Sequence, residues 1–271
     1  MNILICGDIV GRAGREVIER FLPDLISEND LGFVIVNGEN SASGFGITKK
    51  ICDQLYKLGV DVITSGNHIW DQKEIINYID NDKRLIRPCN FPSETPGRGY
   101  GVFKLRNGNL ISIINVMCRL FMDSIEDPFR SLDEIIEQIK INHGNHSIVV
   151  DIHGESTSEK MALGHYLDGR VTAVFGTHTH IPTSDLQILE KGTFYQTDLG
   201  MCGDYDSVIG MKKEACIHRF TKSFLKTRLE PASGEGTLCG TIIKIDKENK
   251  VSEFQQILKG GRLNNGRSFK I

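Results

Sequence analysis

Five short groups of carboxylate, carboxamide and imidazole side chains follow directly on apolar runs of strand length. They are, in chain order, Asp8; Glu39 with Asn40; Asn67 with His68; His153; and His178 with His180. Carboxylate oxygens, amide oxygens and imidazole nitrogens are the donors that divalent transition metals accept from proteins. If the fold gathers these groups, the chemistry they support is binding of one or two metal ions.

Each of these residues also has an ordinary structural interpretation when it is taken alone. Asp8 could be a turn or N-cap residue, and His153 could be a buried, hydrogen-bonded histidine. His178 and His180 are harder to dismiss, because in an extended chain residues i and i+2 point to the same side. The metal-site hypothesis therefore rests on the whole constellation. Four other histidines follow no early strand and are expected to be surface or structural residues: His143, His146, His165 and His218.

Apolar runs alternate with helical patterns through the first two thirds of the chain, which favours βαβ units and a partly parallel sheet. Strands are expected at residues 3–6, 33–36, 60–64, 110–116, 148–152 and 171–175, and helices at 15–26, 48–58, 71–79, 131–141 and 156–167. Capping boxes are expected at the starts of the last three helices. The carboxyl ends of parallel strands share one edge, so the five polar groups are expected to converge there.

After Gly176 the pattern changes to short β runs at residues 186–189, 193–197, 215–220 and 241–245. These runs are expected to form a second sheet packed face to face on the first. Two long segments, 87–101 and 122–129, are expected to be loops at the rim of the site.

Composition limits the classes of function. The chain has 271 residues, 39% of them hydrophobic, and a formal net charge of -3. It can bury a large core, and we expect a single domain over residues 1–271. The charge gives no basic footprint for a long nucleic acid. No apolar stretch approaches the roughly 18 residues of a membrane span, and we expect a cytoplasmic protein. Seven scattered cysteines are expected to be reduced thiols without a catalytic role.

The opening stretch ILICGDIVGRAGRE could be a phosphate cradle or a scaffold that presents Asp8. Its G-x-x-x-G-x-x-G spacing differs from the G-x-G-x-x-G dinucleotide fingerprint, and no P-loop lysine follows. The spacing favours the scaffold, with Gly7 and Gly11 expected to leave room for cations and phosphate.

The ordered motifs resemble the five sequence blocks of the calcineurin-like metallophosphoesterases. The matching blocks are Asp8, G-E-N at 38–40, G-N-H at 66–68, H-G-E at 153–155 and G-T-H-T-H at 176–180. The longer motifs N-G-E-N, S-G-N-H-I-W-D and G-T-H-T-H-I-P resemble the bacterial YmdB-like branch, from Met1 to about Gly260. The resemblance implies a four-layer α-β-β-α sandwich of two mixed sheets, an α/β fold.

The same resemblance implies a dinuclear centre in which Glu39 bridges two ions. One ion is assigned to Asp8, Glu39, Asn40 and His180, and the other to Glu39, Asn67, His153 and His178. The first block of the wider superfamily is usually Asp-x-His, whereas Val10 stands where that histidine would be. Asn40 is positioned to replace it. Iron or manganese is expected, and zinc also suits this mixed set of oxygen and nitrogen donors.

His68 then matches the general acid of the family. The implied activity is hydrolysis of small phosphodiesters, with 2′,3′-cyclic nucleotides as the expected substrates, by a metal-bridging hydroxide and protonation of the leaving group by His68. Relatives suggest a homo-oligomer. Two alternatives stay open: a phosphomonoesterase on the same metal core, and a regulatory protein that binds a nucleotide with little turnover.

Overall fold

Two stacked β-sheets form the centre of the computed structural model, which describes residues 1–222, 227–263 and 268–270. The first sheet, in spatial order, is β13 (Ser268–Lys270), β12 (Val251–Lys259), β11 (Gly236–Ile245), β10 (Met201–Asp204), β1 (Asn2–Ile9), β2 (Leu31–Asn37) and β3 (Val62–Thr64). The second is β4 (Tyr100–Lys104), β5 (Leu110–Met117), β6 (Ser147–His153), β7 (Ala173–Thr177), β9 (Phe194–Gln196) and β8 (Gln187–Ile188).

Both sheets are mixed. In the first, β10, β1, β2 and β3 run parallel, while β11, β12 and β13 are antiparallel to their neighbours. In the second, β5, β6, β7 and β9 run parallel between antiparallel edge strands β4 and β8. The parallel strands of each sheet therefore bring their carboxyl ends to one edge.

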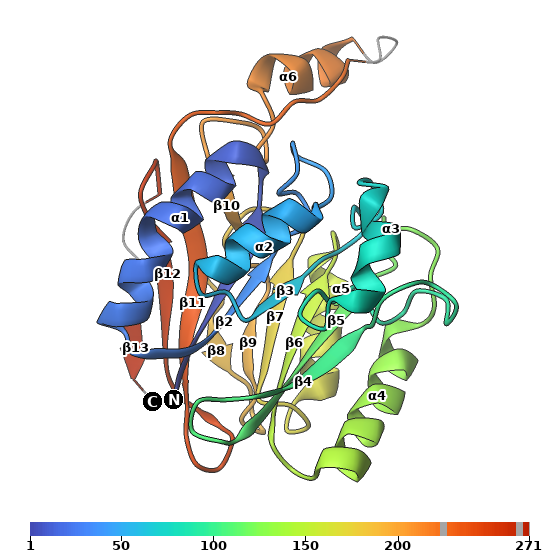
Figure 1. Ribbon diagram of the computed structural model, residues 1–271, viewed down its shortest axis with the longest axis vertical. Coiled ribbons are helices and arrows are strands. Elements are labelled where there is room, and N and C mark those ends of the chain that lie inside the picture. The colour runs from blue at the N-terminus through green and yellow to red at the C-terminus, as the bar shows by residue number, and fades with distance from the viewer. Residues whose placement is uncertain (223–226, 264–267, 271) are drawn as a thin grey trace.

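Helices cover the outer faces of the sandwich (Figure 1). They are α1 (Gly11–Glu28), α2 (Lys49–Lys57), α3 (Glu74–Tyr78) with the short η1 (Ile79–Asn81), α4 (Pro128–His143) and α5 (Thr157–Leu167), while α6 (Lys213–Thr221) lies apart from these layers. The first three pack on the first sheet, and α4 and α5 pack on the second. The predicted four-layer α/β architecture is confirmed.

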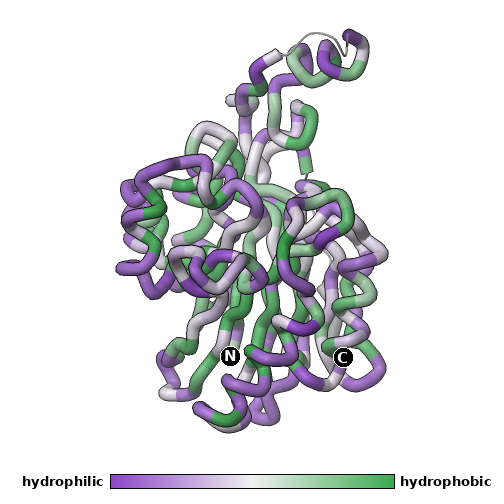
Figure 2. Tube along the Cα trace, turned by 90° about the vertical axis from the view of Figure 1, so that its right-hand side faces the viewer, coloured by the Kyte–Doolittle hydropathy of each residue, from purple (hydrophilic) through white to green (hydrophobic). Residues whose placement is uncertain are grey.

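Three buried clusters correspond to the three contacts between the four layers. On β1, Leu4 and Cys6 face the helices, whereas Ile3 and Ile5 face the other sheet. This alternation follows from the two-residue period of a strand. A third cluster joins the outer face of the second sheet to α4 and α5. Because the inner strands are covered on both sides, they are apolar along most of their length, as Figure 2 shows in green.

The division of the chain between the sheets differs from the prediction. The first three strands pair with the last four, and the middle of the chain builds the second sheet. β1 brings this about, because it pairs with β11 from Asn2 to Cys6 and with β10 at Asp8 and Ile9. The expectation of an early sheet packed on a late sheet was wrong, since sequence distance does not determine strand pairing.

One expected strand is a helix. Residues 215–220 lie in α6, which projects away from the sandwich (Figure 1, orange), and only Cys216 in it is buried. An apolar run this short has no periodicity that separates helix from strand. The strand β4 was also missed, since its first residues lie in the segment expected to be a loop.

The three predicted capping boxes were wrong, although the helices are present. Helix α4 begins earlier than expected, at Pro128. Its N-cap is Asp127, whose carboxylate accepts hydrogen bonds from the amides of Phe129 and Arg130. Ser156 makes no capping bond at α5. α3 begins after Lys73, because the carboxylate of Asp71 is engaged by His68 instead.

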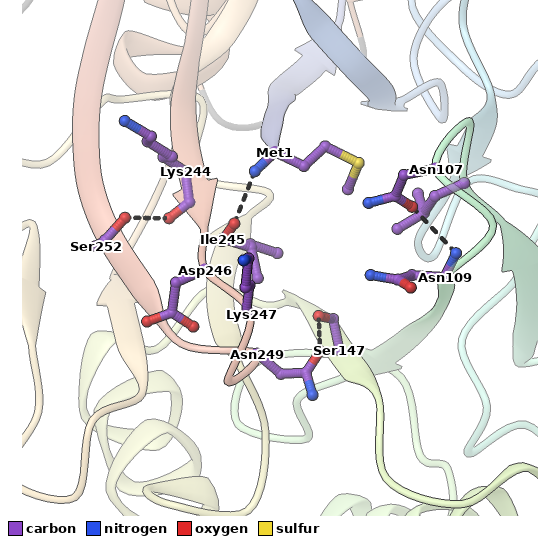
Figure 3. Close-up of a pocket in the computed structure, with 11 residues that line it drawn as sticks. Met1, Asn107, Asn109, Ser147, Lys244, Ile245, Asp246, Lys247, Asn249 and Ser252 are labelled. Atoms are coloured by element: carbon purple, nitrogen blue, oxygen red, sulfur yellow. Dashed lines mark hydrogen bonds between the residues drawn. The ribbon is translucent and has the colours of Figure 1, made fainter.

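The opposite end of the sandwich contains a separate cavity of about 410 Å³ (Figure 3). It lies where β1 and β6 begin, and Met1, Ser147 and Asn249 are among its lining residues. The terminal ammonium of Met1 donates to the Ile245 carbonyl at 2.7 Å, and Ser147 donates to Asn249 at 2.9 Å. Among the described residues, no helix is both long enough and apolar enough to cross a membrane.

Candidate metal centre

All the predicted ligand groups lie at the carboxyl ends of strands from the two sheets. The first sheet contributes Asp8 near the end of β1, Glu39 and Asn40 after β2, and Asn67 and His68 after β3. The second sheet contributes His153 as the last residue of β6, and His178 and His180 after β7. The site therefore straddles the boundary between the two sheets.

His153 lies at the middle of the densest group of donors. Its Nε2 lies 3.0 Å from Glu39 Oε1, 3.1 Å from Asn67 Oδ1 and 3.0 Å from His178 Nδ1. The ligand atoms of Glu39, His153 and His178 all lie within 4.8 Å of one another, so these three residues could hold a metal ion. One proton on Nε2 can serve only one of the three neighbouring atoms, whereas a cation can bind all four donors.

The ionisable side chains of this group shift one another's pKa values. Burial disfavours the charged forms of both Glu39 and His153, but their mutual contact outweighs it. The pKa of His153 is raised to about 9 by the Glu39 carboxylate, and the pKa of Glu39 is held at about 2 by the imidazolium. Burial lowers the pKa of His178 to about 3, which leaves this imidazole neutral and able to act as a ligand.

A second group of donors surrounds Asp8. Its Oδ2 accepts from the His178 amide at 3.1 Å, while Oδ1 lies 3.9 Å from His180 Nε2. Asp8 Oδ1 and Asn40 Oδ1 are buried and lack a hydrogen-bond partner. Asn40 Nδ2 donates to the Gly44 carbonyl at 3.2 Å, which commits the nitrogen and leaves the oxygen free. Burial raises the pKa of Asp8 to about 6. Buried oxygens without donors are the signature of a site that a cation completes.

The two histidines after β7 reach different donor groups because of their backbone. His178 and His180 have φ angles of 95° and 65°, in the left-handed region that residues other than glycine rarely adopt. The prediction of an extended i, i+2 pair with both rings on one side was therefore wrong. His178 faces His153, while His180 faces Asp8 and places its Nδ1 2.8 Å from the Ile209 carbonyl oxygen, to which it donates. Strain of this kind is common where side chains must be held for function.

A buried hydrogen-bond relay orients His153. Its Nδ1 lies 2.9 Å from Thr177 Oγ1, and the Thr177 hydroxyl donates to Asp151 Oδ1 at 2.7 Å. Because the hydroxyl proton is committed to Asp151, the hydroxyl oxygen accepts from Nδ1–H. This arrangement leaves Nε2 directed at Glu39 and Asn67, as in the carboxylate-oriented histidines of metal sites.

A buried ion pair supports the loop that carries His178 and His180. Lys160 of α5 is fully buried and donates to Asp198 at 2.8 Å and to the Thr177 carbonyl at 3.1 Å. Asp198 in turn accepts from the amides of Thr179 at 3.1 Å and Gly200 at 2.9 Å. The pair thus fixes the backbone on both sides of His178.

His68 lies at the edge of the centre, with 29% of its side chain exposed. Its amide donates to Glu39 Oε2 at 3.2 Å, and its Nδ1 lies 2.8 Å from Asp71 Oδ2. The ring of Phe45 packs edge-on against it, with centroids 5.0 Å apart. With Nδ1 held by Asp71, Nε2 is the nitrogen available to a substrate.

Two glycines near the centre lack the Cβ atom that would clash with neighbouring atoms. A Cβ on Gly66 would lie 2.2 Å from both Glu39 Oε2 and His153 Nε2, so only glycine leaves space for these ligand atoms. A Cβ on Gly7 would lie 1.8 Å from the Gly200 carbonyl oxygen. Gly7 therefore permits contact between two backbone segments, and this is a different role from the space for cations that the sequence suggested.

The four histidines that were expected to be surface or structural residues lie outside the metal centre. His143 and His165 are exposed, His146 lies 2.7 Å from the Ser112 hydroxyl, and His218 lies in α6. Sequence reasoning missed the residues that orient the ligands, namely Asp71, Asp151, Lys160, Thr177 and Asp198. Asp71 and Asp151 lie within or beside the motifs, whereas Lys160 and Asp198 gave no local signal.

The side chains present fit the metal ions that the resemblance implies. The donors are carboxylate, amide and imidazole groups, two of their oxygens are buried without partners, and Gly66 keeps the space between them open. This chemistry suits divalent transition metals.

A two-sheet α/β sandwich with such a donor set defines the metallophosphoesterase class. A family model described as "YmdB-like protein" matches residues 4–257, and the chain belongs to this family. It is 46% identical over 250 residues to a 2′,3′-cyclic-nucleotide 2′-phosphodiesterase of Bacillus subtilis, covering 92% of this chain and 93% of the relative.

Solved structures agree with this assignment. A phosphatase from Mycoplasma pneumoniae is 35% identical with a TM-score of 0.89, covering 96% of this chain and 93% of its own. A hypothetical protein from Thermus thermophilus is 37% identical with a TM-score of 0.89, covering 97% of this chain and all of its own. The resemblance drawn from the motifs is confirmed.

Proposed function

We propose that this protein is a metal-dependent phosphodiesterase that hydrolyses small phosphodiesters of the 2′,3′-cyclic nucleotide class. The observation that carries the proposal is the convergence of Glu39, Asn67, His153 and His178 beside His68 at the boundary of the two sheets. The activity named for the Bacillus subtilis relative supports the substrate class.

In this proposal Glu39, Asn67, His153 and His178 would hold one ion, and Asp8, Asn40 and His180 would hold a second together with Glu39. Bound metal supplies the Lewis acidity that lowers the pKa of a water and offsets charge on a phosphoryl oxygen. Hydrogen bonds from the protein keep the ligands in place. Thr177 contacts His153, Asp198 holds the backbone next to His178, and the Ile209 carbonyl accepts from His180.

His68 is the proposed general acid. In the hydrolysis, a water loses one proton to the solvent and its oxygen becomes bonded to phosphorus. The bond from phosphorus to a ribose oxygen breaks, and that oxygen takes a proton from His68 Nε2, which then regains a proton from the solvent. Asp71 holds Nδ1 at 2.8 Å, which orients the ring and leaves Nε2 for the leaving group. Partial exposure of His68 allows it to reach a leaving group at the rim.

The His68→Ala variant tests this assignment. It should retain its metal content, because His68 is outside the ligand set. Turnover of a nucleoside 2′,3′-cyclic phosphate should fall by about 10²- to 10⁴-fold, and turnover of bis(p-nitrophenyl) phosphate should fall less, since p-nitrophenolate leaves without a proton. Elemental analysis and the two rate assays provide the measurements.

His165→Ala on the exposed face of α5 is the matched control and should behave as wild type. Equal rates for His68→Ala and wild type on the cyclic nucleotide would remove His68 from the reaction.

A phosphomonoesterase is the second candidate, favoured by the similarity of this chain to the phosphatase from Mycoplasma pneumoniae. Both activities use the same core, so relative rates on p-nitrophenyl phosphate and its diester separate them. A regulatory protein would instead bind the cyclic nucleotide in its metal-loaded form without releasing product.

A further inference from the structure

A pocket next to the metal centre has no role in the reaction described above. Its volume is about 370 Å³, and it is lined by Ser43, Phe45, Arg219, Arg228 and Leu229. Two segments build it: the loop that follows β2, and the projecting part of the chain that carries α6 (Figure 1).

Phe45 is the wall that separates this pocket from the proposed general acid. Its ring packs edge-on against His68 with 5.0 Å between centroids, and its carbonyl accepts from Gln72 Nε2 at 2.8 Å. The same short loop contains Gly44, whose carbonyl accepts from Asn40 Nδ2. The pocket and the proposed general acid are therefore both in contact with one aromatic ring.

The pocket has a local positive charge in a protein whose net charge is -3. Arg219 and Arg228 are both exposed, and within the described ranges neither forms an ion pair. The carboxylate nearest in sequence, Glu230, lies 2.7 Å from Lys212, which is the main cause of its lowered pKa, and Arg228 acts on it more weakly. Two guanidinium groups beside apolar Phe45 and Leu229 suit a phosphate attached to a nucleoside, because guanidinium donors match phosphate oxygens in pairs.

We propose that this pocket binds a second phosphate of the substrate, on the 5′ side of the nucleotide whose cyclic phosphate occupies the metal centre. The inference rests on the proposed function and makes it more specific. The second phosphate can be the 5′-monophosphate of a free nucleotide or the phosphodiester that links the terminal nucleotide to an RNA chain. Phe45 then contacts the ribose or base between the two phosphates.

The test compares three substrates on metal-loaded protein: a nucleoside 2′,3′-cyclic phosphate, its 5′-phosphorylated form, and a dinucleotide ending in a 2′,3′-cyclic phosphate. Wild type should show a KM about tenfold lower for at least one substrate that carries the second phosphate. The double variant Arg219→Gln/Arg228→Gln should lose this advantage, while kcat for bis(p-nitrophenyl) phosphate and for the unphosphorylated nucleotide stays unchanged.

Arg130→Gln, on the exposed surface of α4, is the matched control and should keep the full advantage. An advantage for the 5′-monophosphate identifies a free nucleotide as the ligand, and an advantage for the dinucleotide alone identifies an RNA end. Equal KM values for all three substrates in wild type would overturn the proposal, as would an advantage that survives in the double variant.

If no cyclic nucleotide is hydrolysed, this result counts against the proposed function. The proposed phosphate site in the pocket is then tested by measuring binding instead of turnover. In that case calorimetry with the 5′-phosphorylated cyclic nucleotide decides. Binding about tenfold weaker to the double variant than to wild type supports the second phosphate site, and equal binding rules it out.

Discussion

The hydroxyl group of Thr177 determines which nitrogen of His153 faces the donor cluster. It donates to Asp151 and accepts from His153 Nδ1, so the relay selects the tautomer with Nε2 free for metal. Asp151 is itself held by Thr64 at 2.5 Å and by Asn37 at 3.2 Å. The orientation of one ligand therefore depends on four buried side chains from both sheets.

Replacing Thr177 by valine keeps the shape of the side chain and removes the relay. We expect Thr177→Val to weaken Mn²⁺ binding by about 10- to 100-fold, measured by calorimetric titration. Thr172→Val is the control, because the Thr172 hydroxyl accepts from the Ile148 amide at the other end of the sheet. The control should lose some stability and keep its metal affinity. Unchanged affinity in Thr177→Val would show that the relay does not orient the ligand.

Metal binding should release protons. The Glu39 carboxylate raises the pKa of metal-free His153 to about 9, so below that pH a proton must leave Nε2 before a cation can bind. The apparent affinity for Mn²⁺ should therefore rise with pH up to about pH 9. Below about pH 6 it should fall further, because Asp8 becomes protonated there. Calorimetry in buffers of different protonation enthalpy measures the release, and an affinity independent of pH would contradict it.

At the scale of elements, the loop after β7 needs support from its neighbours because its conformation is strained. His178 and His180 both have positive φ, and left-handed backbone in such residues costs on the order of 1–3 kcal/mol each. Lys160 of α5 and Asp198 after β9 provide the support through backbone contacts at Thr177 and Thr179. Helix and strands are thus joined through a charged contact beneath the site.

Removing Lys160 should leave Asp198 buried and unpaired. We expect Lys160→Met to lower the free energy of unfolding by about 3–5 kcal/mol and to reduce metal affinity as the loop relaxes. Lys49→Met, which breaks an exposed pair with Asp53, should leave the free energy of unfolding nearly unchanged. Denaturant unfolding of metal-free protein and a Mn²⁺ titration provide the measurements. If Lys160→Met matched Lys49→Met in both, the buried pair would have no supporting role.

At the scale of the molecule, the metal centre joins two sheets whose main contact is apolar. Asp8, Glu39 and Asn67 come from one sheet, and His153 and His178 come from the other. A bound ion therefore bridges the two halves of the sandwich. Without it, buried oxygens such as Asp8 Oδ1 lack a partner.

Chelation should consequently lower thermal stability. A ligand present at 1,000 times its Kd stabilises the folded state by about 4 kcal/mol, so the Tm should fall on metal removal and recover with added Mn²⁺ in a concentration-dependent way. Differential scanning calorimetry measures this. The same Tm before and after chelation would show that no ion links the two sheets.

The motifs and their resemblance to a known family were enough to predict the four layers, and local patterns were enough to place the donor groups at the ends of strands. Each donor group follows an apolar run directly, and parallel strands bring their carboxyl ends together, so Asp8, Glu39 and His153 could be assigned from local patterns. Helices α1 to α5 were also predicted, because amphipathic periodicity is a property of consecutive residues, whereas α6 was predicted as a strand. Their caps were not, since a side chain such as that of Asp71 can bind another side chain, here His68, instead of capping the helix.

Only the tertiary structure decided which strands share a sheet, how His178 and His180 diverge, and what holds the ligands in place. Strand pairing, the buried pair of Lys160 with Asp198, and the pocket between Phe45 and Arg219 all join segments that are far apart in sequence. Their free energy comes from packing and burial, which local patterns do not record. The motifs therefore identified the chemical groups, and the packing of the two sheets determined how they are oriented.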